Sequence, residues 1–562
     1  MKRVRVSGAG VAALALLSVF VAPPSPAAAD DVHVIPPDPV AIDDLGALQE
    51  IYGASATKPR ARVADPTATA GCGSPAVDPV LDDERIVVKI EPVHSFTVGA
   101  ISASSWRNPP SADPTWRLNY LGLMWMKSIA RRAAMDGQTK ALNVIVNQAL
   151  KFYQQNPDPG SNKYGWDEGT ALRRLETMNC LYALTNNAAL RPGMWADAKV
   201  QMGSRYYGPP NYKVHNHGLM ANLQVLRAGQ QLNIPEWRKL AADRMVSEAP
   251  KSFSGSGTSF EQSSMYQGVN ATLWGTAVTK LTEAGNPTAA GKVNKVVGPA
   301  RVVYQWMTQP DGNITQVGNS YEQAGQKGSL TAPRVFRDMQ TGWAIGRWSW
   351  TDPNAVYYTI RTGPSKFAHG QHDRAGGVTF SAKGVRVLVG PGAFSYDTTN
   401  NYALYQMGPQ SQNVALPGGK AVTNAGGTFT AWKEQAPAHA WTVSDKMFGV
   451  AHTRGININR DTVAMKVSDS FPSSVSVWRQ YWHLDPKWTL VSGGANGVKL
   501  VFAHPSGRRL TVTTNGRVSN VVKGVTRPPA GWHFPKFGSR VQGYEIVIRS
   551  YGRASTTTFQ VS

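Results

Sequence analysis

The sequence predicts a two-domain α+β protein in which a helical region is followed by an antiparallel β-sandwich. Between Trp106 and about Thr308, apolar residues recur every three or four positions, which is the spacing of amphipathic helices. From Val335 onwards they recur every second position between Gly and Asn turns, which is the pattern of antiparallel strands. Short Gly, Pro and Asn connections join the helices, so we expect antiparallel helix pairs in a bundle or a toroid of hairpins.

The first 29 residues have the features of a secretory signal peptide. A basic stretch at residues 2–5 precedes an apolar run that ends near Val21, and residues 27–29 offer a small-residue cleavage site. This run is too short for a membrane anchor, and no later stretch approaches ~20 uninterrupted apolar residues. We therefore expect a secreted, extracellular protein without membrane insertion. Residues 30–85 are rich in Pro, Ala and Asp and are expected to form an extended arm.

Basic residues outnumber acidic ones along the chain. The formal net charge is +22. It falls to +19 when the signal peptide, which contains three basic residues and no acidic ones, is removed. A basic exported protein suits a polyanionic partner such as an acidic polysaccharide. Basic runs interleaved with aromatic residues are not evident, so we do not expect nucleic acid as the partner. Cys72 and Cys180 allow a single disulfide and offer no cysteine-based metal site.

The helical domain is expected over residues 86–325. Its clearest apolar stripe, at positions i, i+3, i+4, i+7 and i+10, consists of Leu142, Ile145, Val146, Ala149 and Phe152.

The β-sandwich is expected over residues 326–562. Its clearest part is a hairpin in which Val378 and Phe380 lie on one strand and Lys383-Gly384 forms the turn. Because apolar and polar residues alternate along both strands, we expect this hairpin to be half-buried. Further period-2 runs lie at 343–350, 356–360, 498–502, 510–513 and 544–548.

Three polar clusters interrupt these patterns, and each has a purely structural interpretation. In residues 214–218, Asn216 could cap a helix with His217 on the surface. In residues 258–266, a Thr258–Glu261 or a Ser259–Gln262 capping box could begin a helix beside a packed Tyr266. The third cluster, His-Gly-Gln-His-Asp at residues 369–373, precedes the hairpin and could be a polar loop.

Taken in order, the clusters resemble the motifs of the heparinase II/III-like polysaccharide lyases. Residues 216–217 match an Asn-His pair at a helix start, and residues 261–266 match an E-x-S-x-x-Y-like context. Residues 369–373 match the H-G-H-x-D motif with one change. The resemblance runs from about residue 106 to beyond residue 413.

This resemblance implies an N-terminal incomplete (α/α) toroid of helical hairpins, a C-terminal antiparallel β-sandwich and a substrate cleft between them. It implies cleavage of a uronic-acid polysaccharide, such as a glycosaminoglycan or alginate, by β-elimination. Asn216 and His217 would neutralise the uronate carboxylate. Tyr266 would protonate the leaving oxygen, and in a syn elimination it would also be the base; His369 would be a second base or a neutralising partner.

Three further residues are candidate substrate contacts. Tyr402, with Tyr405 as the alternative, could close over the substrate from a loop. Arg174, with Arg173 as the alternative, could bind a carboxylate or simply lie exposed on its helix. His372, in the third cluster, could bind substrate.

The sequence departs from the family pattern where many members hold a structural zinc ion. Gln371, Gly390 and Gln412 stand at the positions of a histidine, an aspartate and a second histidine. Zinc needs three or four nitrogen, carboxylate or thiolate donors, which neutral amides and a glycine do not supply. We therefore expect no zinc and no cofactor.

Two other functions fit the sequence. A glycoside hydrolase on a helical toroid would need two carboxylates across the scissile bond, and Asp167, Glu168 and Glu261 are available. A catalytically degenerate protein that binds acidic polysaccharide would fit the missing metal ligands. Elimination leaves an unsaturated, UV-absorbing end, hydrolysis leaves a plain reducing end, and a binding protein leaves the polymer intact.

Overall fold

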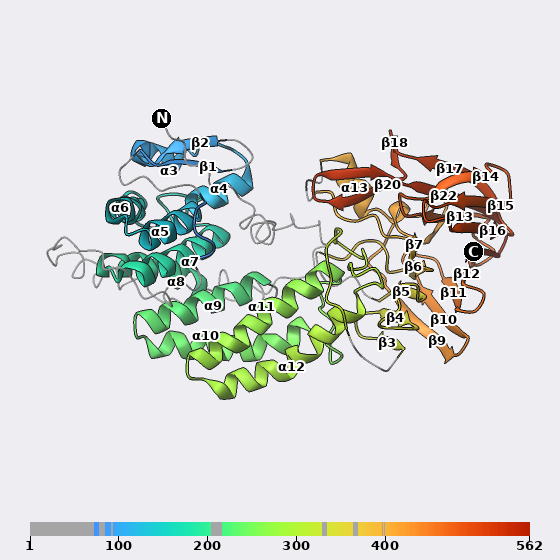
Figure 1. Ribbon diagram of the computed structural model, residues 1–562, viewed down its shortest axis with the longest axis horizontal. Coiled ribbons are helices and arrows are strands. Elements are labelled where there is room, and N and C mark those ends of the chain that lie inside the picture. Colours follow the sequence, from blue (N-terminus) through green and yellow to red (C-terminus); the bar gives the residue numbers. More distant parts are fainter. Residues whose placement is uncertain are drawn as a thin grey trace. The chain divides into compact units, whose positions relative to one another are not determined.

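The computed structural model shows helices in the first part of the chain and antiparallel strands in the second (Figure 1), so the predicted fold class is confirmed. The predicted signal peptide and most of the predicted arm lie outside the described residues. The residues that the structure describes are 72–77, 85–90, 94–203, 216–328, 334–363, 369–395, 397 and 399–562.

The described chain forms two compact units, and the junctions between them fall inside three long helices. The first unit comprises residues 1–246 and 279–290, and the second comprises residues 247–278 and 291–562. The three helices are α10 (Pro235–Ser252), α11 (Ser264–Glu283) and α12 (Pro287–Trp306). The predicted domain boundary between residues 325 and 326 stays a prediction.

The first unit is mainly helical and has a short strand pair near its start. The strands are β1 (Val87–Ile90) and β2 (His94–Thr97). The helices are α3 (Ala103–Arg107), α4 (Pro114–Leu121), α5 (Trp125–Met135), α6 (Thr139–Gln155), α7 (Glu168–Thr185), α8 (Arg191–Met202) and α9 (Asn216–Gln231). The predicted stripe from Leu142 to Phe152 lies on α6, and all five of its side chains are buried. A disulfide joins Cys72 to Cys180 on α7, with Cα atoms 5.1 Å apart.

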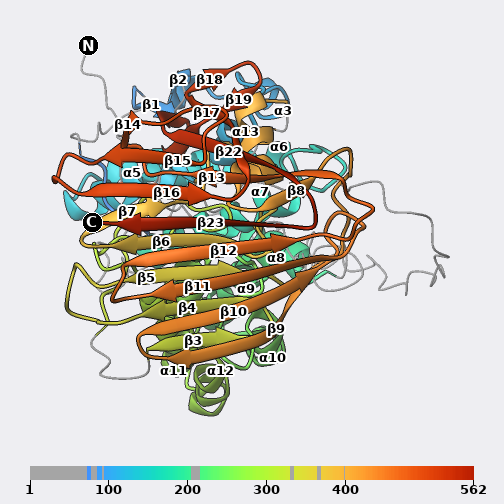
Figure 2. The ribbon, with the colours of Figure 1, turned by 90° about the vertical axis from the view of Figure 1, so that its right-hand side faces the viewer.

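The second unit contains three larger antiparallel sheets that share one apolar core. The five-stranded sheet consists of β3 (Val335–Asp338), β4 (Trp343–Arg347), β5 (Tyr357–Arg361), β6 (Gly377–Ala382) and β7 (Val385–Leu388). The eight-stranded sheet, which faces the viewer in Figure 2, has the order β14 (Thr489–Ser492), β15 (Lys499–Ala503), β16 (Arg509–Thr514), β23 (Ala554–Val561), β12 (Ala464–Ser470), β11 (His452–Asn459), β10 (Ala438–Asp445) and β9 (Gly427–Gln435). The four-stranded sheet has the order β17 (Arg517–Lys523), β22 (Tyr544–Tyr551), β13 (Val477–His483) and β8 (Ala415–Pro417).

The predicted hairpin is β6 and β7, and its turn has the expected geometry. Lys383 and Gly384 have φ values of 51° and 77°, and two positive values match the right-handed twist of a tight hairpin. The prediction of half-burial is wrong, because Thr379 and Ser381 are buried as well. The Thr379 hydroxyl bonds to those of Thr315 (3.1 Å) and Thr359 (2.7 Å), so the polar face of β6 is covered by the segment that carries Thr315. A sheet covered on both faces buries both sets of alternating side chains.

Within the described ranges, no helix is both long and apolar enough to cross a membrane.

Candidate active site

Tyr266 and His369 lie face to face in the second unit. Their ring centroids are 3.4 Å apart and their planes differ by 11°. Tyr266 is almost fully buried, whereas a fifth of the His369 side chain is exposed. Two residues that are 103 positions apart in the sequence therefore form one pair of proton-transfer groups with an opening to solvent on the histidine side.

The first turn of α11 fixes the position of Tyr266. The Ser263 hydroxyl accepts a hydrogen bond from the Tyr266 backbone N–H (3.3 Å), which is the N-cap arrangement of a helix. The predicted capping boxes at Thr258 and Ser259 are therefore not what begins this helix. The Ser263 hydroxyl also forms a hydrogen bond with the Ser320 hydroxyl (2.9 Å). This bond connects the start of the helix to the loop that carries Ser320.

Gly318 allows that loop to pass between the start of α11 and the loop that carries His369. Its φ is +65°, and a Cβ atom would lie 2.6 Å from the Gln262 carbonyl oxygen and 2.7 Å from the His369 carbonyl oxygen. The next residue, Asn319, donates its backbone N–H to the His369 carbonyl (2.8 Å). A side chain at residue 318 would push these segments apart, so glycine is needed here.

Glu261 completes this group of residues. One of its carboxylate oxygens lies 3.7 Å from His369 Nε2, and the carboxylate is largely buried. A buried carboxylate beside an imidazole favours the protonated ring. Glu261 belongs to the matched motif, but the resemblance implied no role for it in elimination. Its spacing, five residues before Tyr266, was the signal in the sequence.

His217 has a similar carboxylate neighbour in the first unit. His217 Nδ1 lies 3.9 Å from Glu168 Oε2, and both side chains are mostly buried. Residue 216 is the first residue of α9, as predicted for a helix start, but its side chain lies outside the described part of the chain. Each of the two candidate catalytic histidines, His217 and His369, therefore has a glutamate within ion-pair distance.

The loop of residues 369–373 is held by amide hydrogen bonds at the positions where a zinc ion would need ligands. Gln412 Nε2 donates to Gln371 Oε1 (3.0 Å), and Gln371 Nε2 donates to the Asn319 side-chain oxygen (3.1 Å) and the Gly392 carbonyl (3.2 Å). Both glutamines are buried. Their amide groups are thus already paired with protein partners.

Residue 390 offers no room for a third ligand. A Cβ atom on Gly390 would lie 1.9 Å from the Gln316 carbonyl oxygen, so an aspartate could not replace it without a backbone shift. Nowhere in the described ranges do three or more His, Cys, Asp or Glu side chains gather in a way that could hold a metal ion. The residues present do not fit a zinc site of the family type.

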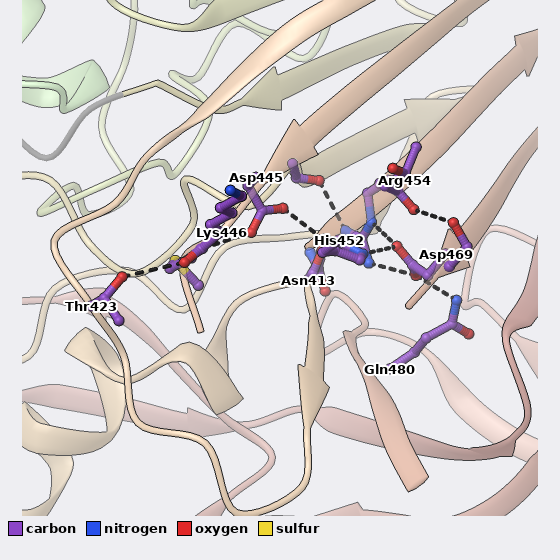
Figure 3. A network of polar contacts seen from close by, with 12 residues as sticks. Asn413, Thr423, Asp445, Lys446, His452, Arg454, Asp469 and Gln480 are labelled. Atoms are coloured by element: carbon purple, nitrogen blue, oxygen red, sulfur yellow. Dashed lines mark hydrogen bonds and ion pairs between the residues drawn. The ribbon is translucent and has the colours of Figure 1, made fainter. Parts of the chain in front are cut away.

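A buried charge network around Arg454, His452 and Asp469 (Figure 3) reaches the segment that follows this loop. Arg454 donates to both carboxylate oxygens of Asp469 (2.6 and 2.9 Å), and its remaining nitrogen donates to the backbone carbonyls of Gly376 (2.9 Å) and Asn413 (2.6 Å). Gly376 lies three residues beyond the 369–373 loop. The position of the loop is therefore coupled to β11 and β12 of the eight-stranded sheet.

His452 joins the network between two carboxylates. Its Nδ1 lies 2.6 Å from Asp445, its Nε2 lies 2.9 Å from Asp469, and all three side chains are fully buried. Burial opposes the charged form, but the hydrogen bonds to both aspartates outweigh it and raise the pKa of His452. Burial likewise opposes the charged form of Asp469, yet Arg454 and His452 hold the pKa of this carboxyl well below its usual range.

His372 is turned toward the backbone of α13 (Asn401–Met407). Its Nδ1 donates to the Met407 carbonyl (2.6 Å), which leaves only Nε2 for another partner. Burial, followed by the charge of Arg374, lowers the pKa of His372, so the ring is neutral at neutral pH. The hydrogen bond of His372 therefore connects the 369–373 loop to the end of α13.

Arg174 is a core residue of the first unit. Its side chain has no exposed surface, its guanidinium pairs with Asp197 (2.5 Å) and it lies over the Phe152 ring at 4.4 Å. It has no surface to offer a substrate, so it does not belong to the candidate site.

The two candidate tyrosines lie on α13. Tyr402 is half-buried among aromatic rings, whereas Tyr405 is buried and its hydroxyl donates to Glu545 (2.9 Å).

Comparison with known proteins supports the architecture described above. Residues 337–562 match the family model described as heparinase II/III-like, C-terminal. A solved heparinase III shares the fold with a TM-score of 0.69 at 14% identity, covering 92% of this chain and 89% of that one. A heparan sulfate lyase HepC mutant from Pedobacter heparinus has a TM-score of 0.66 at 15% identity, covering 84% and 81%. No curated protein sequence matches the chain. At these identities the structural likeness establishes the fold.

Proposed function

Because this chain carries a heparinase II/III-like C-terminal domain on the fold of heparinase III, we propose that it is a polysaccharide lyase. Its substrate in this proposal is an acidic polysaccharide that contains uronic acid. The reaction is β-elimination, which breaks the bond between C4 and the glycosidic oxygen without adding water. We also propose that the enzyme is secreted; the predicted signal peptide and the Cys72–Cys180 disulfide both suit an oxidising compartment.

The stacked pair of Tyr266 and His369, with Glu261 beside the histidine, is the observation that carries this proposal. β-Elimination needs a base for the C5 proton and an acid for the departing oxygen. A phenol and an imidazole in contact supply both kinds of group. The carboxylate of Glu261 favours the imidazolium form of His369, and a positive charge against the phenol ring favours its ionised form.

The proposed elimination moves one proton and breaks one C–O bond. The base takes the proton from C5, the electron pair of that C–H bond forms the C4=C5 double bond, and the C4–O bond breaks. Tyr266 then protonates the departing oxygen, so that one product ends in a hydroxyl and the other in an unsaturated uronate. In a syn elimination Tyr266 would also be the base, with the imidazolium of His369 stabilising its ionised form. Otherwise His369 is the base and reacts in its neutral form.

We assign to Asn216 and His217 the neutralisation of the uronate carboxylate. The C5 proton is poorly acidic while that carboxylate carries its full negative charge. An amide donor and an imidazole lower the energy of the enolate-like charge as it develops.

The basic composition of the chain supports a polyanionic substrate, since a net charge of +19 after removal of the predicted signal peptide attracts it over long distances. The test is a screen in which the protein is mixed with heparan sulfate, chondroitin, hyaluronan, alginate and bacterial exopolysaccharides. New ultraviolet absorbance from an unsaturated end supports the proposal. New reducing ends without that absorbance would instead show a hydrolase, and tight binding to an intact polymer would show a binding protein.

A further inference from the structure

Aromatic rings from three segments gather beside α13. Tyr402 lies 5.5 Å from Phe394, 5.7 Å from Trp532 and 6.3 Å from Phe534, measured between ring centroids. The last two rings belong to β20 (Trp532–Lys536), which pairs with β21 (Ser539–Gln542) in a short hairpin. Phe534 is fully buried, whereas Tyr402 and Phe394 retain some exposure, so the cluster has a buried base and an accessible side.

Arg540 lies on the accessible side of this cluster. Its guanidinium carbon is 4.3 Å from the centroid of Tyr402 and 5.2 Å from that of Trp532. The residue itself is exposed. Two electron-rich faces hold the guanidinium while water still reaches it.

The charge of Arg540 has no acidic neighbour: among the residues that the structure describes, no carboxylate lies within ion-pair distance of it. Arg337 shows the usual alternative. It lies 5.0 Å from the ring of Trp432, but its guanidinium also pairs with Glu434 at 3.1 Å. Arg540 is therefore a cation that the rings position and that no carboxylate of the described chain neutralises.

A guanidinium carries its N–H groups in its own plane, so a guanidinium whose carbon lies over a ring can still present an edge of N–H donors to a ligand. That edge matches the two oxygens of a carboxylate or a sulfate group. Since the rings already restrict the side chain, less conformational entropy is lost when an anion binds. The arrangement suits an anionic sugar substituent.

The cluster is connected to the loop that carries His369. Tyr402 and Met407 are five residues apart on α13, a rise of ~7.5 Å along the helix, and Met407 accepts the hydrogen bond of His372 (2.6 Å). The turn of the β20–β21 hairpin is attached as well, because the Gly538 N–H donates to the Phe394 carbonyl (2.8 Å). All of these residues belong to the second unit.

We propose that Arg540, positioned by Tyr402 and Trp532, is a subsite that binds a carboxylate or sulfate group of the polysaccharide at a sugar unit away from the bond that is cut. This inference rests on the proposed function for the identity of the polymer. It assigns to Tyr402 a positioning role for Arg540.

The test compares Arg540→Gln and Arg540→Lys with the unmodified protein. Calorimetric titration with size-defined oligosaccharides of heparan sulfate and of hyaluronan gives binding constants; the first carries sulfates and carboxylates, the second carboxylates only. Loss of a charge-assisted contact is expected to weaken binding roughly tenfold or more in Arg540→Gln. Lysine keeps the charge without the planar fork, so Arg540→Lys should recover part of the affinity. A loss with both oligosaccharides identifies the carboxylate as the bound group, and a loss with heparan sulfate alone identifies the sulfate.

Arg337→Gln is the matched control, because it removes another ring-stacked arginine whose charge is already paired. It should bind both oligosaccharides as the unmodified protein does. Unchanged binding in Arg540→Gln, an equal loss in Arg337→Gln, or failure of the unmodified protein to bind either oligosaccharide would overturn the subsite. Melting temperatures separate a binding loss from misfolding. If binding depends on Arg540 but no polymer yields an unsaturated product, the lyase proposal fails and the subsite stands.

Discussion

Tyr266 and His369 are stacked with their ring centroids 3.4 Å apart, and this contact joins the start of a helix to the entrance of a β-hairpin. At this separation the charge of one ring acts directly on the other. Removing the tyrosine hydroxyl would leave the stack in place, because the ring is retained. Chemistry and packing can therefore be tested separately at this pair.

The first prediction is that Tyr266→Phe abolishes turnover while substrate binding and melting temperature change little. A positioned acid–base group contributes about 10²–10⁴-fold in rate, and here only the transition state needs the hydroxyl proton. Initial rates of unsaturated-product formation, with binding measured in parallel, check this. A variant that keeps most of its activity would show that Tyr266 is a packing residue.

A second prediction concerns Glu261, whose carboxylate lies 3.7 Å from His369 Nε2. Glu261→Gln keeps the size of the side chain but removes the charge that favours imidazolium. We expect kcat to fall about tenfold, a barrier increase of ~1.4 kcal/mol, and the histidine limb of the pH–rate profile to move to lower pH. Glu283→Gln, which removes an exposed helix carboxylate paired with Lys280, is the control. An unchanged profile would make Glu261 a structural residue only.

The third prediction concerns stability and pH in the network of His452 and Asp469. The raised pKa of His452 means that its stabilisation is present below its unfolded pKa of ~6.5 and is lost as pH rises through the higher folded value. The lowered pKa of Asp469 means that its stabilisation is present above ~3.9 and is lost as pH falls. The network should therefore stabilise the protein most between about pH 4 and 6.5.

Melting temperatures across this range, for the unmodified protein and His452→Gln, measure that contribution. Removing one member of a buried charge network costs about 3–5 kcal/mol. The difference between the two proteins should be largest at mildly acidic pH and should shrink on the alkaline side. A difference that does not vary with pH would mean that His452 is neutral in the folded protein.

Chelation should leave the protein unchanged, which is the fourth prediction. The loop of residues 369–373 is held by the Gln371–Gln412 amide pair (3.0 Å), and Gly390 has no room for a carboxylate. A strong chelator should therefore alter neither activity nor melting temperature, and elemental analysis should find no stoichiometric zinc. Gln371→Ala, by contrast, should cost about 1–3 kcal/mol, because it leaves buried polar partners unsatisfied. Stoichiometric metal lost together with activity would contradict this account of the loop.

Finally, substrate binding should weaken steeply as salt is added. The net charge of +19 that remains without the predicted signal peptide attracts a polyanion through Coulomb forces that mobile ions screen over ~10 Å at 0.1 M. Affinity for the polymer that the screen identifies, measured from low to high ionic strength, checks this. Equal affinity throughout would indicate a neutral glycan as the ligand.

The sequence predicted the order of helices and strands because hydrophobic period reports directly on secondary structure. The Lys383-Gly384 turn was also predictable. A two-residue hairpin turn needs positive φ at both positions, and glycine between two alternating runs marks such a turn. Burial of the polar face of β6 was not, because Thr315, which covers it, lies 64 residues before Thr379. The alternation of apolar and polar residues along one strand does not reveal that a distant segment of the chain covers its polar face.

The buried charges escaped the sequence analysis for a similar reason. His452 and Arg454 occupy the same strand face as the buried Ile456, yet polar residues at the end of a strand read as solvent-exposed. Arg174 is comparable, because its partner Asp197 lies on the next helix, 23 residues away. The order of the three motifs identified Tyr266 and His369 as candidates. Only the folded structure shows that their rings are in contact.

The Cys72–Cys180 disulfide has a consequence for how the protein responds to proteolysis. Cys72 lies at the start of the described chain and Cys180 lies within α7, so the bond closes a loop around β1, β2 and the first helices. A single backbone cut within that loop leaves both fragments covalently attached. The fragments of a nicked molecule would therefore migrate together on a denaturing gel until a reductant cleaves the bond.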